Sequence, residues 1–405
     1  MSFTISLSGL NAASDDLSVT ANNIANASTN GFKESRSEFA EIFAVSADSV
    51  ARNVTGSGVR LNNIAQQFTQ GNIDFTGNNL DLAITGEGFF TLSDNGSTSY
   101  TRAGQFAVDR DGYVGDSDGR RLQVYPSLGN GAFNTGGLED LRLLTDQNSP
   151  QATTDITLGV NLPADAEVPP NGTFDQNDPL SFSHTTSTTT FDSLGATHTT
   201  SVYFIKTDVA NEWDTRVFVD GEETGPPQTL TFDSLGRLTS PANGILTAPP
   251  FSLANGSAEL NFSIDFQLTT QFGGAYGVNA LSQDGFASGR LTGIEVDPTG
   301  VVFARFTNGR SDEIGQVALS NFSSLDNLGQ IGDTNWVETF GSGDALRGEA
   351  GTASFGLIQS GALESSNVDL TAQLVSMINA QRNFQANAQV ISTADEVTQT
   401  IINIR

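Results

Sequence analysis

Hydrophobic residues recur at helical spacing at both ends of the chain. Over the first ~25 residues they lie three, four or seven positions apart, which predicts an amphipathic helix that stops near Asn30-Gly31. No glycine or proline occurs from Ala362 to Arg405, and Ser366 with Asp369 predicts a capping box that opens a helix of about 40 residues. The predicted apolar stripes are Phe3, Leu7, Leu10, Leu17 and Ile24 in the first helix, and Leu370, Leu374, Met377, Phe384 and Ile391 in the second.

The other faces of both predicted helices carry asparagine and glutamine where a solvated helix would carry charged pairs. Amide side chains suit close contact with other subunits or a wet lumen without fixed charge. One amphipathic pair of this length also buries too little apolar surface to be stable alone. We therefore expect an antiparallel, coiled-coil-like pair that also packs against other molecules. A plain two-helix hairpin that happens to be amide-rich is the alternative.

Between the ends the pattern changes to short stretches of alternating apolar and polar residues, such as 202–205 and 216–219. Glycine, asparagine and aspartate interrupt these stretches about every 8–12 residues, as is typical of sandwich- or barrel-like β-domains. The pentapeptide Phe-Asp-Ser-Leu-Gly occurs twice, at 191–195 and 232–236. Four D-x-x-G sequences predict tight turns, in which aspartate binds its own turn and glycine takes a positive φ. They begin at Asp109, Asp192, Asp233 and Asp297.

Proline marks the layout, because all twelve prolines lie between Pro126 and Pro298. The sequence predicts a mainly β fold with α-helical termini, in which nested, discontinuous β-domains accompany the antiparallel pair of N- and C-terminal helices. The predicted parts are a helical domain of 1–30 and 361–405, a linker or extended region of 31–70 that includes a Gly-Ser-Asn-rich stretch at 46–63, a first β-domain of 71–150 and 286–360, and an inserted outer β-domain of 151–285.

The charge balance is strongly acidic, with 46 acidic and 18 basic residues and a formal net charge of −28. Such a surface repels phosphate backbones and anionic lipid headgroups, so we expect neither nucleic acid nor membrane partners. Cysteine is absent, which excludes disulfides and thiolate chemistry. No apolar run is long enough to span a bilayer, and the N-terminus carries no Sec-type signal peptide. We expect export without a cleaved signal.

Residues for catalysis are scarce. The two histidines, His184 and His198, stand in Thr/Ser-rich segments and are expected to be exposed strand residues. No nucleophile elbow, zinc-binding helix or phosphate-binding loop is present. A calcium loop is conceivable at 109–112 with 116–119, but this segment lacks the register and closing Glu of an EF-hand, so paired β-turns are the preferred interpretation. We expect no catalytic residue, no cofactor and no metal.

Three sets of residues resemble a known family. The first is Ser8 to Ala13 with Asn22, Asn23, Ile24, Asn26, Asn30, Gly31, Phe32 and Lys33. The second is Gly361 to Leu370 with Gln381, Arg382 and Asn383, and the third is Gly88-Phe89-Phe90 with Tyr100 to Phe106. In this order the three sets resemble the N-terminal, C-terminal and first β-domain signatures of the flagellar rod and hook family. Length favours hook over rod, since distal rod subunits lack so large an insertion.

The resemblance implies a structural subunit that leaves the cell through the flagellar type III export apparatus. It would polymerise with itself beneath a cap into a curved hollow tube, with the terminal helices inside and the β-domains outside. The tube would join rod to filament and act as a flexible joint outside the cell, so that further expected partners are the distal rod, the hook cap and the hook–filament junction proteins. A distal rod or other axial subunit is the near alternative. A β-rich adhesin or glycan-binding protein is a distant one.

Overall fold

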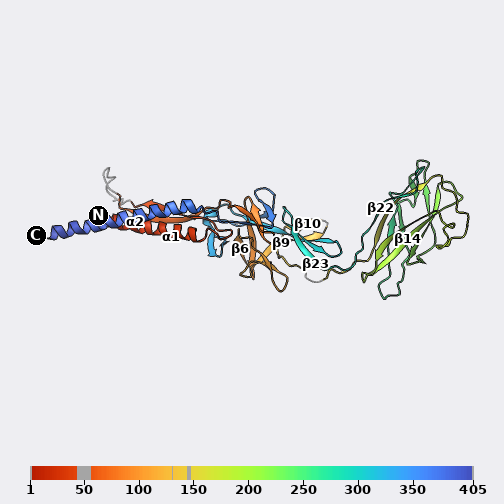
Figure 1. Cartoon of the computed structure of the whole chain (residues 1–405), viewed down its shortest axis with the longest axis horizontal. Helices are drawn as coiled ribbons and strands as arrows, with labels where there is room; N and C mark the ends of the chain where they lie inside the picture. Colours follow the sequence, from red (N-terminus) through yellow and green to blue (C-terminus); the bar gives the residue numbers. More distant parts are fainter. Residues whose placement is uncertain (1, 43–55, 130, 144–146, 404–405) are drawn as a thin grey trace. The chain divides into compact units, whose positions relative to one another are not determined.

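The computed structural model describes residues 2–42, 56–129, 131–143 and 147–403. Helix α1 (Ser2–Ala25) opens the chain and helix α2 (Leu370–Asn403) closes it (Figure 1). Apart from one 3-10 turn at Leu325–Asn327, the described residues between them form strands, turns and loops. The prediction of a mainly β chain with helical termini is confirmed.

Contacts divide the chain into two compact units. The helices belong to the same unit as the first β-domain and do not form a third body. Unit 1 comprises Met1–Leu143, Gly293–Arg305 and Ser311–Arg405, and unit 2 comprises Leu144–Thr292 and Phe306–Arg310.

Part of the region 31–70, predicted as linker or extended, forms a β-hairpin. Strand β1 (Ser35–Glu41) pairs antiparallel with β2 (Val59–Gln66), and both contact α1. The Val59 N–H donates to Ser8 Oγ at 3.2 Å. These two extended segments are therefore part of unit 1, because their backbone polar groups find partners in each other and on the helix. Residues 43–55, most of the predicted stretch 46–63, lie outside the described residues.

Unit 1 is organised by a sheet of thirteen strands, along which β23-β24-β25-β9-β5-β6-β27-β26 form the main path. Its core includes Leu82, Phe90, Leu122 and Val317, which are at most 1% exposed. A second cluster brings Phe89 and Trp336 edge to face at 5.7 Å. The thirteen strands are β5 (Phe89–Asp94), β6 (Ser97–Thr101), β7 (Ala107–Val108), β8 (Val114–Gly115), β9 (Arg121–Gly129), β10 (Ala132–Phe133), β11 (Glu139–Asp140), β23 (Leu291–Val296), β24 (Val301–Phe306), β25 (Ser311–Asn321), β26 (Gly329–Gly332), β27 (Asn335–Val337) and β28 (Leu346–Glu349). Two further pairs of strands lie outside this sheet: β4 (Leu82–Thr85) with β29 (Leu357–Ser360), and β3 (Ile73–Phe75) with β30 (Ala362–Glu364).

Unit 2 has two sheets that share one apolar core, as in a sandwich. Val160, Phe204, Trp213 and Ile264 come from both sheets and are fully buried. The first sheet contains β12 (Asp155–Pro163), β19 (Ile245–Thr247), β20 (Ser263–Asp265), β21 (Thr270–Phe272) and β22 (Gly277–Gln283). The second contains β13 (His184–Phe191), β14 (Thr197–Lys206), β15 (Glu212–Val219), β16 (Glu222–Glu223), β17 (Gln228–Phe232) and β18 (Leu238–Ser240).

The four predicted D-x-x-G turns are confirmed, and a fifth at Asp116 has the same geometry. In each, the aspartate Oδ1 accepts the N–H groups two and four residues further on, at 2.8–3.0 Å. The glycine that follows takes a φ of 76° to 87°, a conformation that favours glycine. Gly112, Gly119, Gly195, Gly236 and Gly300 occupy this position.

The expectation that both histidines are exposed is wrong. His184 stacks on the ring of Tyr276 at 4.3 Å between centroids. The side chain of His198 is only 10% exposed, because its Nδ1 lies 2.6 Å from Asp220 and its Nε2 lies 3.3 Å from Asp192. Asp192 itself is fully buried. Strand alternation could not show this, since the aspartates come from two separate turns.

These contacts shift the pKa values of the two histidines in opposite directions. Burial opposes protonation of His198, but hydrogen bonds to Asp220 and Asp192 outweigh it and raise its pKa above 6.5. Burial also disfavours ionised Asp192, yet hydrogen bonds from Asn255, Ala196, His198 and Leu194 lower its pKa to about 2. Burial alone lowers the pKa of His184.

The stability of unit 2 should therefore depend on pH. Because the pKa of His198 is raised on folding, its contribution to stability is complete below about pH 6.5 and is lost as pH rises through the pKa of the folded state. The pKa of Asp192 is lowered on folding, so its contribution is present above about pH 4 and is lost as pH falls towards 2. His198→Gln should lower the free energy of unfolding more at pH 5 than at pH 9. Urea unfolding followed by Trp213 fluorescence in a Trp336→Phe background measures this, since the chain has only two tryptophans.

His184→Gln is the matched control. Folding lowers the pKa of His184, so protonation below about pH 6.5 destabilises the wild type. The free energy of unfolding of His184→Gln, compared with that of the wild type, should therefore be more favourable at pH 5 than at pH 9. Equal losses at both pH values for His198→Gln would show that the two aspartates do not hold a charged imidazole.

Candidate functional site at the helical ends

Helices α1 and α2 lie side by side and antiparallel (Figure 1). Near the end of α1, Asn23 Nδ2 donates to Gln373 Oε1 in the first turn of α2, at 3.2 Å. Near the start of α1, Gly9 faces Asn387, and a Cβ added to Gly9 would lie 2.7 Å from the Asn387 Oδ1. A side chain at position 9 would therefore displace the end of the Asn387 side chain.

Small and amide side chains form the seam between the helices. In α1, Ser6, Ala13 and Thr20 are buried and seven residues apart. In α2, Gln373 and Ala380 are buried and Asn387 is half-buried at the same spacing. A seven-residue repeat keeps one face of each helix on its partner, and small side chains bring the axes close.

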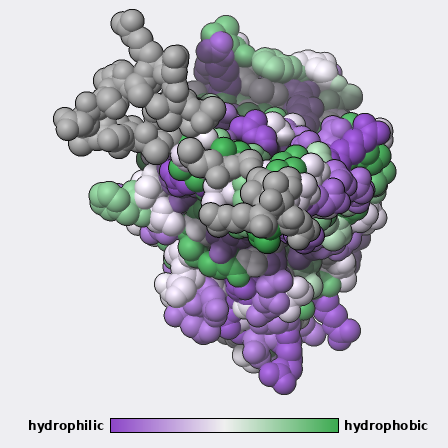
Figure 2. All heavy atoms as spheres, turned by 90° about the vertical axis from the view of Figure 1, so that its left-hand side faces the viewer, coloured by the Kyte–Doolittle hydropathy of each residue, from purple (hydrophilic) through white to green (hydrophobic). Residues whose placement is uncertain are grey.

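The predicted apolar stripes flank this seam and do not fill it. The side chains of Phe3, Leu7 and Leu374 are 46%, 42% and 51% exposed. Figure 2 shows hydrophobic groups among hydrophilic ones at the end of the molecule where the helix termini lie. Leu370 and Phe384 are also exposed, whereas Leu10, Leu17, Ile24, Met377 and Ile391 are half-buried. Val375, Ile378, Val390 and Val397 add further exposed apolar surface to α2.

Helix α2 extends beyond its partner. It has 34 residues against 24 in α1, a difference of about 15 Å at the rise of an α-helix. An open groove of about 960 Å³ lies between Phe3 and this part of α2, lined by residues such as Val390, Ala394 and Val397.

The start of α2 differs from the predicted capping box. Asp369 is the N-cap, because its Oδ1 accepts the N–H groups of Thr371 and Ala372 at 2.8 and 3.2 Å. Ser366 instead accepts the N–H of Val368, one turn too early to cap the helix. The prediction that Ser366 opens the helix is wrong, because the helix begins at Leu370 and the residue directly before it, Asp369, occupies the N-cap position.

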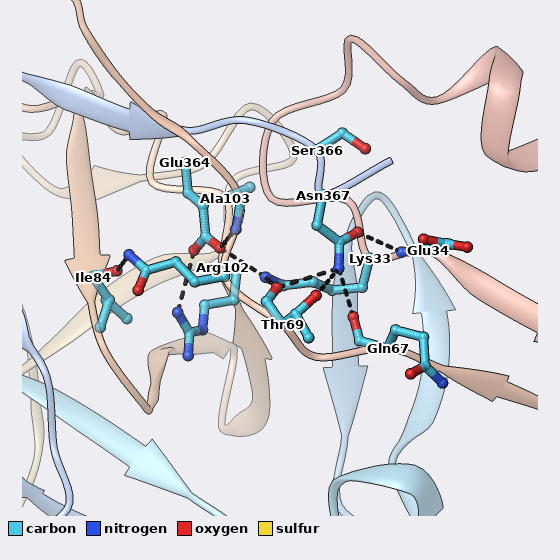
Figure 3. A network of polar contacts seen from close by, with 12 residues as sticks. Lys33, Glu34, Gln67, Thr69, Ile84, Arg102, Ala103, Glu364, Ser366 and Asn367 are labelled. Carbon is cyan, nitrogen blue, oxygen red and sulfur yellow. Dashed lines mark hydrogen bonds and ion pairs between the residues drawn. The ribbon is translucent and has the colours of Figure 1, made fainter. Parts of the chain in front are cut away.

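A buried cluster of three charges anchors the helical pair to the β-structure of unit 1 (Figure 3). Glu364, at the end of β30, accepts Lys33 Nζ at 2.7 Å and Arg102 at 3.2 Å. The three side chains are 0%, 1% and 6% exposed. The Gly71 N–H donates to the same carboxylate at 2.9 Å. One carboxylate thus holds the exit from α1, the entry to α2 and the end of β6.

Both cations of the cluster also bind backbone carbonyls, although the buried Arg102 Nε has no hydrogen-bond partner. Lys33 Nζ also donates to the Thr69 carbonyl at 2.8 Å, and Arg102 donates to the Gly86 carbonyl at 2.8 Å. The Arg102 guanidinium lies 5.3 Å from the centre of the Phe89 ring. These contacts offset part of the desolvation of two buried cations.

Amide side chains extend the cluster into α2 (Figure 3). Asn367 Oδ1 accepts the Glu34 N–H at 2.7 Å, and its Nδ2 donates to the Gln67 carbonyl at 2.7 Å. Gln373 Nε2 donates to the Glu34 carboxylate at 2.8 Å. Asn23 joins this set, because its amide bonds both backbone groups of Ser35 as well as Gln373.

Burial dominates the electrostatics of the cluster. It lowers the pKa of Lys33, and the ion pair with Glu364 only partly compensates. Burial likewise lowers the pKa of Arg102, again opposed by Glu364. Both cations therefore depend on one carboxylate to remain charged at low cost.

Comparison with known proteins agrees with this architecture along the whole chain. Four family models match in order: Flagella basal body rod protein (3–33), Flagellar hook protein FlgE/F/G D1 domain (83–173), Flagellar basal body protein FlaE D2 domain (161–286) and Flagellar basal body rod FlgEFG protein C-terminal (359–404). The flagellar hook protein FlgE of Salmonella typhimurium is 37% identical, and the alignment covers 100% of both chains. The chain belongs to the flagellar hook protein family.

More distant members agree. The flagellar hook protein FlgE of Rhizobium meliloti is 35% identical over 98% of this chain and 97% of its own. The crystal structure of the Helicobacter pylori flagellar hook protein FlgE2 matches with a TM-score of 0.55 at 14% identity, covering 72% of this chain and all of that one, which supports the fold. The hook family chain described here is thus a structural component of the flagellum, a subunit of its hook.

The family signature residues have distinct positions in this hook subunit. Gly31, with a φ of 70°, donates its N–H to the Glu364 carbonyl at 2.7 Å, and a Cβ there would lie 2.5 Å from the Ala103 nitrogen. Phe32 and Asn23 are buried. Ile24, Asn26 and Asn30 are half-buried, whereas Asn22, Gln381, Arg382 and Asn383 are exposed on the helices.

In the described ranges, no group of three or more His, Cys, Asp or Glu residues could hold a metal ion. In the candidate calcium segment, Asp116 and Asp118 bind Arg120 at 3.0 and 2.7 Å. Neither α1 nor α2 is apolar enough over a sufficient length to cross a bilayer.

Sequence reasoning missed the charge cluster of this hook subunit. Its signal was weak: Lys33 is one of only two lysines in the chain, and Glu364 and Arg102 stand inside motifs quoted only for their resemblance. The small-residue seam had a clearer signal, since Ser6, Ala13 and Thr20 repeat at seven residues.

Replacing the central carboxylate should be costly. Glu364→Gln leaves two buried cations without their counter-ion, and breaking a buried ion pair in this way costs about 3–5 kcal/mol of unfolding free energy. The deficit should shrink as pH rises towards the usual lysine pKa of ~10.4, because Lys33 can then lose its proton. Urea unfolding followed by Trp336 fluorescence in a Trp213→Phe background tests both points.

Glu38→Gln is the matched control. Glu38 pairs with Arg36 at 3.0 Å on the surface, with 39% and 63% of the side chains exposed. Its loss should change stability by no more than about 1 kcal/mol. A similar, small effect of Glu364→Gln would contradict the role given to the cluster.

Proposed function

We propose that copies of this hook subunit polymerise, through the exposed apolar residues of the helical pair, into a curved hollow tube. The tube joins rod to filament and transmits torque as a flexible joint. The observation that carries the proposal is the helical pair itself: its seam is small and polar, and large apolar side chains such as Phe3, Leu7 and Leu374 are left exposed. Covering that surface with neighbouring copies contributes about 25 cal/mol per Å² of apolar area.

The low charge of the helices supports close packing of many copies. Helix α1 carries only Asp15 and Asp16, and α2 only Arg382, Asp395 and Glu396. Amide faces can meet other copies, or a wet channel, without the desolvation cost of charges. The β-structure of the two units forms the outer layers of the tube. Equally acidic copies make few strong charge pairs with one another there, so neighbouring subunits can slide past each other as the tube bends.

The other expected partners follow from membership of the family. The subunit passes through the flagellar type III export apparatus and assembles outside the cell. It contacts the distal rod, the hook cap and the hook–filament junction proteins. It has no catalytic activity. A distal rod or other axial subunit is the second candidate, favoured only by the two rod-protein models that match the chain's ends.

Electron microscopy of the purified, polymerised chain tests the proposal. Short, curved, hollow tubes are expected. Straight rods would favour the second candidate, and a chain that stays monomeric under all assembly conditions would contradict polymerisation as its function.

A charge on the exposed stripe should abolish assembly. Leu374 is half exposed in the monomer, so Leu374→Asp should leave unfolding of both units within about 0.5 kcal/mol of wild type. In the polymer the carboxylate would be buried without a partner, which costs several kcal/mol for each copy. Sedimentation of polymer and unfolding of monomer measure the two effects.

Ser376→Asp provides the control, because it adds the same charge at an exposed polar position of the same helix turn. It should be better tolerated than Leu374→Asp. Normal tubes from Leu374→Asp would remove this residue from the assembly contact.

A further inference from the structure

The turn that joins β24 to β25 belongs to a different unit from most of its two strands. Residues 301–305 and 311–321 lie in unit 1, whereas Phe306–Arg310 lies in unit 2. Unit 2 is an insertion in the sequence of unit 1, for which two crossings of the chain would be enough. Because of this turn, the chain instead crosses between the units four times.

Hydrogen bonds join the turn to residues 286–290, close to the point where the chain returns to unit 1 after Thr292. The Thr307 N–H donates to the Arg290 carbonyl at 2.9 Å, and the Arg290 N–H donates to Thr307 Oγ1 at 3.0 Å. Asn308 Nδ2 donates to the Ala287 carbonyl at 2.7 Å. Backbone and side-chain groups of the turn thus hold the same short segment.

Close packing and one aromatic contact accompany these bonds. A Cβ added to Gly289 would lie 2.7 Å from the Asn308 Cγ, so the glycine leaves room for that side chain. The Arg310 guanidinium lies 4.5 Å from the centre of the Phe286 ring, within the range of a favourable cation–π contact. The turn therefore contacts the segment along its length, from Phe286 to Arg290.

The turn needs none of these contacts to close. The Phe306 N–H donates to the Arg310 carbonyl and the Gly309 N–H donates to the Phe306 carbonyl, both at 3.0 Å. Asn308 Oδ1 accepts the Arg310 N–H at 3.0 Å, and Gly309 takes a φ of 81°. A preformed turn has little freedom left to lose when it makes a further contact. Its bonds to residues 286–290 are additional to those that fold the hairpin.

The segment that receives the turn is itself held within unit 2. Gln151 and Phe286 exchange both backbone hydrogen bonds at 3.0 Å, and the Asn148 N–H donates to the Gly289 carbonyl at 2.9 Å. The turn thus binds a connection in which two segments of unit 2 already hold each other.

We infer that the β24–β25 turn is a tether that restricts movement between unit 1 and unit 2. Units joined only by connecting segments are expected to move against each other, and each further connection removes part of that freedom. Hydrogen bonds near water and a cation–π contact each contribute modestly, so the tether can open reversibly. The inference concerns the single subunit and does not rest on polymerisation. In a tube of the proposed kind, the tether would set how easily each subunit changes shape as the tube bends.

Distances between the units test the tether in the monomer. The chain has no cysteine, so Phe340→Cys in unit 1 and Leu180→Cys in unit 2, at side chains 106% and 57% exposed, introduce the only two sites for spin labels. Asn308→Ala with Arg310→Ala removes two side chains that hold the tether. The distance distribution from double electron–electron resonance should become broader. Trypsin should also cut after Arg290 on the order of 10-fold faster, because a lost hydrogen bond raises the open population about that much.

Asn79→Ala is the matched control. Asn79 Nδ2 donates to the Ile294 carbonyl at 2.7 Å, the same kind of bond at the same distance, with both residues in unit 1. Its loss should leave the distance distribution unchanged. An unchanged distribution in the double variant, or equal broadening in Asn79→Ala, would overturn the inference and leave the proposed function intact.

Gly289→Ala disturbs the same contact without altering the turn. Its methyl group would displace the Asn308 side chain from the opposite side, so the distribution should broaden again. Trp213 fluorescence during urea unfolding shows whether unit 2 remains folded in each variant. If the double variant does not fold, an unchanged distribution in folded Gly289→Ala would overturn the inference by itself.

Discussion

The carboxylate of Glu364 is the constraint on which the arrangement of unit 1 depends. It is fully buried and neutralises two cations, Lys33 and Arg102, that come from distant parts of the chain. Burying three charges is favourable only when all of them meet with good geometry, because each alone carries a large desolvation cost. The cluster is therefore satisfied only when the exit from α1, the entry to α2 and the β-structure are assembled together. This dependence specifies one arrangement of helices that otherwise share little apolar contact.

The helical pair shows how a monomer can be folded and still incomplete. Its seam uses Gly9, Ala13 and Ala380 and a few amides, so the helices approach closely without consuming their large side chains. A pair with leucine in the seam would be more stable alone and would have less apolar surface left for neighbours. The polar network of Asn23, Asn367 and Gln373 then supplies the register that apolar packing would otherwise provide. The polar seam thus orients the two helices, and the exposed apolar side chains remain available for contacts with other copies.

Unit 2 is stabilised in a different way. Its sheets enclose a continuous apolar core around Trp213, and its turns are closed locally by aspartates such as Asp192 and Asp233. The same turn recurs in unit 1 at Asp109, Asp116 and Asp297, so one local device serves both units. His198 is the exception, because it joins two separate turns through Asp192 and Asp220. The two carboxylates favour the charged form of His198, whereas the half-buried His184 stacks on the ring of Tyr276.

Features set by local rules could be predicted from the sequence. Helical periodicity gave both terminal helices, alternation gave a mainly β middle, and the D-x-x-G turns were correct because aspartate and glycine act within five residues. Motifs at both ends also indicated the family. Within 31–70, predicted only as linker or extended, the pairing of β1 with β2 did not follow from the sequence, since local rules do not show which segments pair.

Only the tertiary structure decided which face of each helix is covered. Periodicity places Leu374 and Gln373 on adjacent positions, but it cannot tell that Gln373 enters the seam while Leu374 stays exposed. That choice depends on Asn23 and Glu34, which lie more than 300 residues away in sequence. The charge cluster follows the same logic, because a buried ion is stable only beside partners that folding brings to it. The sequence determined the elements and their turns, and long-range polar pairing determined how the ends are joined and what they leave exposed.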